Sequence, residues 1–321
     1  METKLKNKKV GIIGSGKFAE FHFKYWSNYK KIKVAGFYSF REINFRDLYK
    51  FNSLEELYSK CDIIDIVTNN IKNFEALIES FNYEKKIIFV EKPFCTNLKE
   101  LRTIEKNIFN TNNTYHTSFF YKKIDSFNKF LLNSEENNIK NIYVRGNYKR
   151  DLFYYKKNKS WRLDKNQSGG GVLINQALHL FDLINEKYDI DISNCIINNK
   201  VSHNEIENFI DFTIQYNNIY INFKFSSNKN NSDTEYIILF KNFFSQIFIT
   251  KNIYSNHILI LFKYTYYFLF TKFFGLKSNN IHPLFSYYDD ILDKKLNSSN
   301  TVFIKKITMM KKVFKIYKLH Y

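Results

Sequence analysis

The stretch KVGIIGSGKFA, residues 9–19, decides the fold of this 321-residue chain. Its first five residues predict a buried strand, and a helix is expected to follow over residues 17–28. Between them, Gly14, Gly16 and Ala19 form a G-x-G-x-x-A motif, which permits a tight turn, close approach of a pyrophosphate and close helix–strand packing. The N-terminus of a helix favours phosphate. The sequence therefore predicts a dinucleotide site at Gly14, Ser15, Gly16, Lys17 and Phe18.

Strands and helices alternate after this turn. Apolar runs predict strands at 32–38, 62–68, 86–90 and 114–120, and helical patterns lie at 54–59, 74–80 and 98–109. Ser53 is expected to cap the first of these helices, with Glu56 at the capping-box position. This alternation predicts an α/β Rossmann domain with a parallel, doubly wound sheet over residues 1–122.

The pattern changes after residue 122. A helix is expected at 126–132, a strand at 141–148 and a helix that ends near residue 185, followed by strand-like runs at 194–225 and 234–253. These features predict a C-terminal α+β domain, residues 123–321, with an open and largely antiparallel sheet.

The composition favours a soluble protein of the cytoplasm. The net charge of +18 comes from lysines spread along the chain, and no nucleic-acid recognition motif accompanies it, so no nucleic-acid partner is expected. The three cysteines form no C-x-x-C pair, which predicts a reducing compartment and no metal site. The charged N-terminus does not resemble a signal peptide.

One apolar segment, residues 257–276, has the length of a membrane span but contains Lys263 and Lys272. A buried helix or a pair of strands is the favoured interpretation. Contact with a membrane surface or with a partner protein is the alternative.

The identity of the dinucleotide stays open. An acidic residue normally ends the second strand of such a domain and binds the adenosine ribose, but residues 36–41, GFYSFR, contain none. Ser39 and Arg41 could instead accept the 2′-phosphate of NADP, or they are an ordinary exposed serine and arginine. NAD and NADP are both possible. Further cofactor contacts are expected where later strands end, at Thr68, Asn69, Asn70, Glu91 and Lys92.

Lys92 lies in a Glu91-Lys92-Pro93 motif directly after a predicted strand. Ligands of open α/β sheets bind at the carboxyl ends of strands, and Pro93 restricts the backbone there. A lysine held at this place could bind a substrate hydroxyl and stabilise the alkoxide that develops as hydride leaves. The alternative is a surface lysine at the start of a loop.

A third motif, GGGVLINQALHLFD, spans residues 169–182. On a regular helix Asn175, His179 and Asp182 would share one face, because they are spaced by four and three residues. His179 could act as a general base near neutral pH. The alternative is a histidine buried in the interdomain core.

Taken together, these three motifs resemble those of the Gfo/Idh/MocA oxidoreductases, and the likeness extends over nearly the whole chain. The resemblance implies an NAD(P)-dependent enzyme in which Lys92 and His179 flank the reacting hydroxyl of a sugar. It also implies a dimer or tetramer formed through the open sheet.

The departures from the family pattern point to one branch. Asn175 stands where many relatives have Asp, and Asn69 and Asn73 replace residues of a Thr-Pro…His motif. The Asn-Gln pair before the histidine resembles the nucleotide-sugar branch, such as UDP-N-acetylglucosamine 3-dehydrogenases of surface-polysaccharide biosynthesis. The segments Arg150-Asp151, Tyr154-Tyr155 and Trp161-Arg162 are similar to that branch too.

The resemblance assigns substrate binding to Lys92, Arg150, Trp161, Arg162, Asn175 and His179. The arginines could bind a carboxylate or phosphate, or they belong to a solvated loop. The leading hypothesis is hydride transfer at a ring hydroxyl, C3 of a nucleotide-linked N-acetyl sugar being the main candidate. A dehydrogenase or reductase of free keto sugars or polyols, and a dinucleotide-binding regulator without turnover, are the alternatives.

Overall fold

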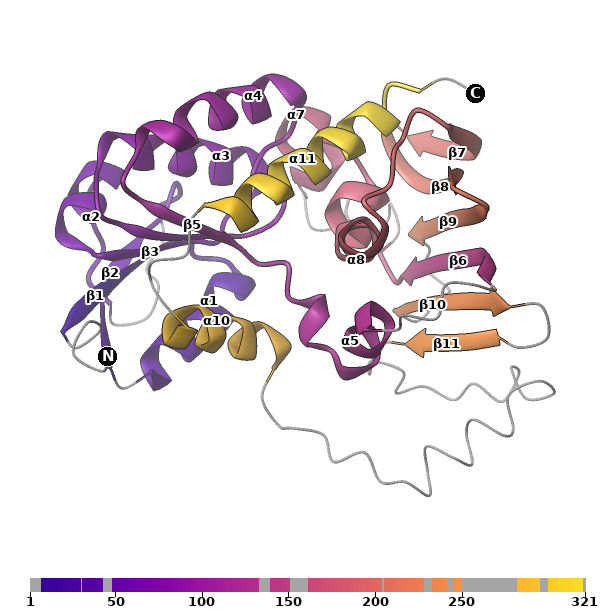
Figure 1. The fold of residues 1–321 in the computed structure, drawn as a ribbon. Helices are drawn as coiled ribbons and strands as arrows, with labels where there is room; N and C mark the ends of the chain where they lie inside the picture. The colour runs from indigo at the N-terminus through magenta and orange to yellow at the C-terminus, as the bar shows by residue number, and fades with distance from the viewer. Residues whose placement is uncertain are drawn as a thin grey trace.

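The computed structural model describes the chain at 7–29, 31–42, 48–132, 139–150, 161–203, 205–227, 233–241, 245–249, 282–294 and 300–319 (Figure 1). The apolar segment at 257–276, residues 250–253 of the last strand-like run, and Asp151, Tyr154 and Tyr155 lie outside these described residues. In the described part of the chain, no helix combines the length and apolar character needed to cross a bilayer.

The N-terminal sheet is fully parallel, as predicted. Its strands lie in the order β2-β1-β3-β4-β5 and have the bounds β1 Lys8–Ile13, β2 Ile32–Tyr38, β3 Ile63–Ile66, β4 Ile87–Val90 and β5 Thr114–Thr117. Every residue of β3 and β4 is buried, as expected for a sheet covered on both faces. The strand order reverses between β1 and β3, and ligands of such sheets bind at this switch point.

Helices cover both faces of this sheet (Figure 1). They are α1 Lys17–Asn28, α2 Leu54–Lys60, α3 Asn70–Glu79 and α4 Leu98–Asn107, with short 3₁₀ turns η2 Ser80–Asn82 and η3 Ile108–Asn110. The Ser53 hydroxyl accepts the amide of Glu56 at 3.0 Å, which confirms the expected cap. Helix α3 begins four residues earlier than predicted, because the Asn69 side chain accepts the amide of Lys72 at 3.0 Å.

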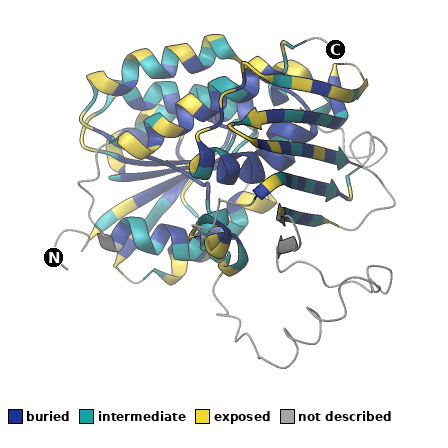
Figure 2. Cartoon of the chain, turned by 45° about the vertical axis from the view of Figure 1, so that its right-hand side comes forward, coloured by how far each residue is buried: buried dark blue, intermediate teal, exposed yellow. Residues whose placement is uncertain are grey.

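The second sheet is mixed and largely antiparallel. Its order is β11-β10-β6-β9-β8-β7, and only β6 and β9 pair in parallel. The bounds are β6 Ile139–Tyr148, β7 Cys195–His203, β8 Ile206–Tyr216, β9 Ile219–Ser227, β10 Thr234–Lys241 and β11 Ser245–Ile249. Burial alternates along β9, so one face packs inward, against α8 (Leu178–Tyr188), while the other faces outward (Figure 2). The expected fold class is therefore confirmed.

Short elements connect the two sheets. After β5 come the 3₁₀ turn η4 and helix α5. The three glycines at 169–171 are preceded by the short helical turns η5 and α7 and followed by a π-helical turn, η6. Their bounds are η4 Tyr121–Lys123, α5 Asp125–Leu132, η5 Trp161–Leu163, α7 Lys165–Ser168 and η6 Leu173–Ala177.

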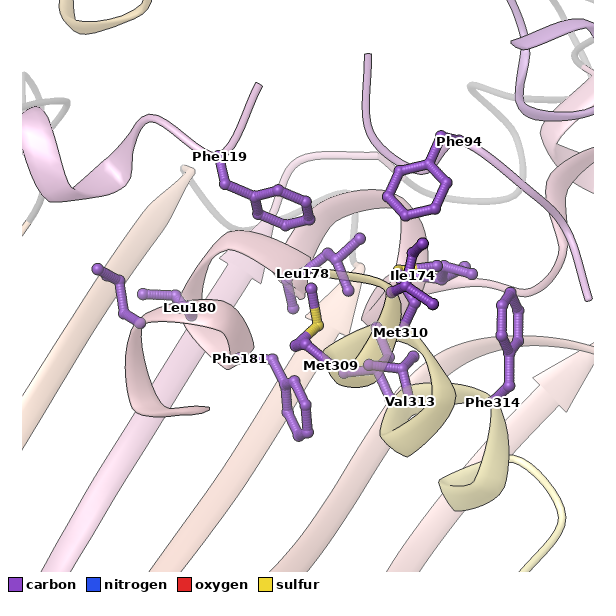
Figure 3. Close-up of a cluster of buried hydrophobic side chains, with 14 of the residues drawn as sticks. Phe94, Phe119, Ile174, Leu178, Leu180, Phe181, Met309, Met310, Val313 and Phe314 are labelled. Carbon is purple, nitrogen blue, oxygen red and sulfur yellow. The ribbon is translucent and has the colours of Figure 1, made fainter. Parts of the chain in front are cut away.

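Two C-terminal helices, α10 (Pro283–Lys294) and α11 (Thr301–Ile316), return to the first domain, and no helix was predicted there. Helix α10 packs on α1, where the rings of Tyr25 and Phe285 lie 4.9 Å apart. Helix α11 places methionines and Val313 and Phe314 in one core with Phe94 of the first domain and Phe181 of α8 (Figure 3). Contacts therefore cross the boundary expected at residue 122, and the division into 1–122 and 123–321 stays a prediction.

Candidate functional site

Gly14 and Gly16 of the G-x-G-x-x-A motif lie in different surroundings. Gly14 adopts φ +137°, and a Cβ there would lie 2.1 Å from the carbonyl oxygen of Val67, so the fold itself requires glycine. A Cβ on Gly16 would meet no atom within 4 Å. Gly16 is the N-cap of α1, and no side chain caps the helix. Open space beside uncapped backbone N–H groups fits a dinucleotide pyrophosphate.

Ser39 lies next to this turn. Its hydroxyl is 2.8 Å from the hydroxyl of Ser15 and accepts the backbone amide of Arg41 at 3.2 Å. Arg41, Lys17 and Phe18 are exposed, Phe18 to 45%. The structure thus brings Ser15, Ser39 and Arg41 together at the end of β2, where the adenosine ribose of a dinucleotide binds.

The side chains that follow β3 are engaged within the protein. The amide of Thr68 donates to Asn73 Oδ1 at 2.9 Å, and Asn69 caps α3. Asn70 Nδ2 donates to the carbonyl of Ser168 at 2.7 Å and to Asn175 Oδ1 at 3.0 Å. Asn69 thus satisfies a helix end and Asn70 joins the two sheets' connecting segments, and the cofactor-binding role expected for these residues stays a prediction.

Asn73 supports the loop that contains Lys92. Its Nδ2 donates to the carbonyls of Glu91 and Pro93, at 3.3 and 3.2 Å. The peptide bond between Lys92 and Pro93 is cis. Asn73 therefore fixes the backbone on either side of Lys92. In the sequence it was noted only as a departure from the family pattern.

Lys92 reaches from the end of β4 to the second domain. Its Nζ donates to the backbone carbonyl of Asn175 at 3.1 Å. Burial lowers the pKa of Lys92 to about 8; the carboxylates of Glu91 and Glu235 raise it, and the charges of Arg150 and Arg162 lower it further. Lys92 is therefore a cation at pH 7 that loses its proton more readily than an exposed lysine does.

The helix after the glycines is irregular at its start. Residues Leu173–Ala177 form a π-helical turn, whereas His179 and Asp182 lie three residues apart in the regular helix α8. Asn175 Nδ2 donates to the carbonyl of Gly170 at 2.6 Å, while Asp182 pairs with Lys306 Nζ at 2.6 Å. That Asn175, His179 and Asp182 share one face stays a prediction.

His179 lies among aromatic rings. Its side chain stacks on Tyr121, with ring centroids 4.2 Å apart and planes 11° apart, and Phe119 and Phe120 lie at 5.7 and 4.8 Å. Burial, together with the charges of Lys92 and Lys306, holds the pKa of His179 well below its usual value. The imidazole is therefore neutral at pH 7 and able to accept a proton.

A buried carboxylate that sequence reasoning missed lies on β10. Glu235 is 7% exposed and accepts hydrogen bonds from the hydroxyls of Tyr121 at 2.5 Å and Tyr148 at 2.7 Å. Burial raises the pKa of Glu235. In the sequence, the only sign of this buried carboxylate was that Glu235 is the single acidic residue of the apolar run TEYIILFK.

Behind the Lys92 loop lies a second missed group, centred on His22 of α1. His22 Nδ1 is 2.9 Å from Asp65 Oδ2, and its Nε2 is 3.4 Å from Glu91 Oε1. Burial opposes a charge on His22, but the two carboxylates outweigh it and raise its pKa to about 9. Glu91, expected at the cofactor, thus has one oxygen directed toward an internal ion pair.

A cavity with two arginines is lined in part by Asn175, the residue whose carbonyl accepts from Lys92. It is lined by Arg150, Arg162, Gly171, Val172, Asn175, Gln176, Ile206, Glu207, Asn208 and Ser227. The guanidinium of Arg162 stacks over Trp161 at 4.2 Å, which orients it. Because the charges of Arg150 and Arg162 also act on Lys92, the structure brings these predicted substrate residues to one region.

The triple glycine is required by packing. A Cβ on Gly171 would lie 1.8 Å from the carbonyl oxygen of Glu207, and the Glu207 carboxylate accepts the amides of Gly171 and Leu173 at 2.6 and 3.0 Å. These contacts seat the π-turn on β8. Among the described residues, no group of three or more His, Cys, Asp or Glu side chains is placed to hold a metal ion.

Comparisons with known proteins bear on the fold and on the dinucleotide-binding domain. Residues 8–119 match the family model described as "Oxidoreductase family, NAD-binding Rossmann fold" (GFO_IDH_MocA). The chain is 25% identical over 187 residues to glucose-6-phosphate 3-dehydrogenase of Bacillus subtilis, a match that covers 55% of this chain and 53% of that relative. The chain thus spans about half the length of this curated relative.

Solved structures share the fold over almost the full length. WlbA dehydrogenase from Bordetella pertussis, in complex with NADH and UDP-GlcNAcA, aligns with a TM-score of 0.71 at 12% identity and covers 98% of this chain and 96% of its own. Myo-inositol 2-dehydrogenase from Lactobacillus plantarum aligns with a TM-score of 0.70 at 13% identity, over 98% and 96%. Residues 8–119 of this chain therefore form an NAD-binding Rossmann domain similar to that of the oxidoreductase family GFO_IDH_MocA.

Proposed function

We propose that the protein is an NAD(P)-dependent dehydrogenase that transfers hydride between the nicotinamide and a ring hydroxyl of an anionic sugar. The observation that supports the proposal is that Lys92 lies close enough for its charge to lower the pKa of His179, and that Asn175, which accepts a hydrogen bond from Lys92, also lines a cavity with two arginines. A regulator that only binds a dinucleotide has no need of a cation and a neutral base at one point.

The two central residues divide the chemistry. The nicotinamide, when bound, accepts or supplies the hydride. Lys92, a cation at pH 7, binds the reacting oxygen and stabilises the negative charge that develops on it. His179, neutral at pH 7, takes the hydroxyl proton. The side chain of Asn175 is engaged by Asn70 and Gly170, so we assign it to holding the π-turn instead of to contact with the substrate.

Arg150 and Arg162 indicate the class of substrate. Guanidinium groups recognise phosphate and carboxylate in a directed, often bidentate manner. Glucose-6-phosphate and UDP-GlcNAcA, named for two of the similar proteins, are both anionic sugars. We place C3 of a nucleotide-linked N-acetyl sugar first, because UDP-N-acetylglucosamine 3-dehydrogenase GnnA from Acidithiobacillus ferrooxidans shares the fold, with a TM-score of 0.61 at 12% identity.

The test is a screen in which nucleotide sugars, sugar phosphates and uncharged sugars or polyols are each offered with NAD and with NADP, and the nicotinamide absorbance is followed. Turnover with anionic sugars only is the expected result. Turnover with uncharged polyols alone would move the protein to the polyol alternative. Cofactor binding without any turnover would favour the regulator.

A charge-matched pair of variants tests the arginine cavity. Arg150→Met is expected to raise KM for an anionic sugar by about tenfold or more, through loss of a charge-assisted hydrogen bond. Arg145→Met removes the same charge from β6, but Arg145 bonds the carbonyl of Asn222 at 2.7 Å and does not line the cavity. Equal effects of the two variants would contradict a specific anion site.

We also propose a cytoplasmic protein that assembles through the outward face of the second sheet. That sheet exposes Ile196 to 66%, Val201 to 48%, Tyr220 to 49% and Phe240 to 41%. Exposed apolar side chains on a sheet are typical of a subunit interface. Light scattering on the purified protein measures the assembly, and a monomer at micromolar concentration would contradict this part of the proposal.

A further inference from the structure

The orientation of His179 depends on ring packing. Among the described residues, no group forms a hydrogen bond with its buried Nδ1. A histidine that acts as a general base is often oriented by such a bond, in which its Nδ1–H donates to a carboxylate or a backbone carbonyl. Here the imidazole instead lies parallel to the ring of Tyr121, with centroids 4.2 Å apart.

The nearest alternatives for orienting His179 are engaged elsewhere. Asp182, three residues further on, accepts both its hydrogen bonds from Lys306, at 2.6 and 2.9 Å. The amide nitrogen of Asn175 donates to the carbonyls of Gly170 and Gly171. Neither side chain therefore replaces the aspartate that orients a histidine in many catalytic sites.

Tyr121 is itself held from both domains. It follows β5 in the turn η4, and its hydroxyl donates to Glu235 Oε2 of the second sheet at 2.5 Å. Its ring also stacks on Phe127 of α5, with centroids 5.6 Å apart and planes 22° apart. The hydrogen bond to Glu235 and the ring contact with Phe127 both restrict the position of the phenol ring.

We propose that Tyr121, anchored by Glu235, is the positioning residue that holds the His179 imidazole for proton transfer. The inference rests on the proposed function, in which His179 is the general base. In this arrangement a stacked ring does the work of an orienting carboxylate, and it leaves His179 neutral. Glu235 acts through Tyr121 and needs no contact with the substrate.

The first test measures the His179 ring directly and needs no substrate. In protein labelled with ¹³C-histidine, the Cε1–H signal of His179, assigned by its loss in His179→Ala, is displaced by the ring current of Tyr121. Tyr121→Leu is expected to move this signal toward the position of an unstacked histidine, while Tyr121→Phe keeps the ring and displaces it less. An unchanged signal in Tyr121→Leu would overturn the proposal.

Tyr58 provides the matched control. It is a buried tyrosine of α2 that donates to the carbonyl of Ala76 at 2.6 Å and stacks on Tyr83 at 5.0 Å and 14°. Tyr58→Phe and Tyr58→Leu therefore remove comparable contacts away from His179. Both are expected to leave the His179 signal in place. A shift as large as that of the Tyr121 variants would show a general loss of packing and overturn the specific role.

The second test is kinetic, with a sugar that the screen identifies. Tyr121→Leu is expected to lower kcat by about 10- to 100-fold, the cost of a misplaced catalytic group, with little change in KM. Tyr121→Phe should recover most of the rate. In the His179→Ala background Tyr121→Leu should have no further effect, because Tyr121 acts through His179.

The outcomes separate the two proposals. If Tyr121→Leu lowers kcat equally with and without His179, Tyr121 acts independently and the positioning role is wrong. If His179→Ala alone leaves kcat unchanged, the proposed function has failed, whatever Tyr121 does to the histidine signal.

Discussion

Lys92 Nζ donates to the backbone carbonyl of Asn175 at 3.1 Å, and this bond places a cation of the first domain against the π-turn of the second. The same turn leads directly to His179. The catalytic pair of the proposed reaction is thus assembled across the domain interface.

Lys92→Met should lower kcat by about 10² or more, because it removes an electrostatic stabiliser of the developing alkoxide. The dissociation constant of the cofactor should change little. The lowered pKa of Lys92 adds a pH signature: the wild-type rate should fall as the pH rises above about 8, where the cation is lost. Steady-state kinetics from pH 6 to 10 measure both effects, and a variant with normal turnover would remove Lys92 from the mechanism.

Gly16→Val should abolish dinucleotide binding and leave the melting temperature near that of the wild type, because the space beside Gly16 holds no protein atom within 4 Å. Gly14→Ala is the contrasting variant. It should lower thermal stability, since a Cβ would lie 2.1 Å from a backbone oxygen at φ +137°. Calorimetric titration with NAD and NADP and thermal unfolding measure the pair. Unaltered cofactor affinity in Gly16→Val would exclude the assigned turn.

His179→Ala should cost about 10² to 10⁴ in rate, the usual effect of losing a general base. Part of the loss should be recovered as the pH rises toward 8, where hydroxide replaces the base and Lys92 is still charged. His116→Ala is the control: this buried histidine of β5, whose pKa burial lowers to about 4, lies beside Phe89. It should reduce thermal stability and leave turnover per folded molecule intact. The opposite pattern would make His179 a structural residue.

The His22 ion pair predicts a pH dependence of folding. The folded-state pKa is raised from 6.5 to about 9, so the contribution to stability is complete below pH 6.5 and is lost as the pH rises through 9. The full loss corresponds to up to about 3 kcal/mol. His22→Gln should remove this dependence. Urea unfolding of the wild type and of His22→Gln at pH 6, 7.5 and 9 measures this contribution. Lys92, whose pKa is also shifted, adds the same pH dependence to the unfolding free energy of both proteins, so it cancels in the difference. Parallel curves would contradict a charged His22.

The fold and the cofactor turn could be predicted from short-range patterns. Strand periodicity, the spacing of Gly14, Gly16 and Ala19, and the Ser53 cap depend on residues close together in the chain, and the structure has them where they were expected. The start of α3 was missed, because its cap, Asn69, precedes a polar turn with no apolar period.

The candidate site was predicted only in part. Lys92, Arg150, Arg162 and His179 were named from motifs and from the family resemblance, and the structure brings the other three within electrostatic range of Lys92. Their supporting residues were not named. The π-turn that contains Asn175 was not predicted either, since a π-turn leaves no mark in the apolar pattern.

The amino-acid sequence by itself determined the two kinds of sheet, the dinucleotide turn and the types of residue available for chemistry, because these follow from local propensity and spacing. Tertiary structure alone decided what each reactive side chain faces. Tyr121 and Glu235 lie 114 residues apart in the chain, and Lys92 and Asn175 lie 83 apart. Contacts at such separations depend on how complete sheets and helices pack, and the burial that sets the pKa values of Lys92, His179 and His22 arises only from that packing.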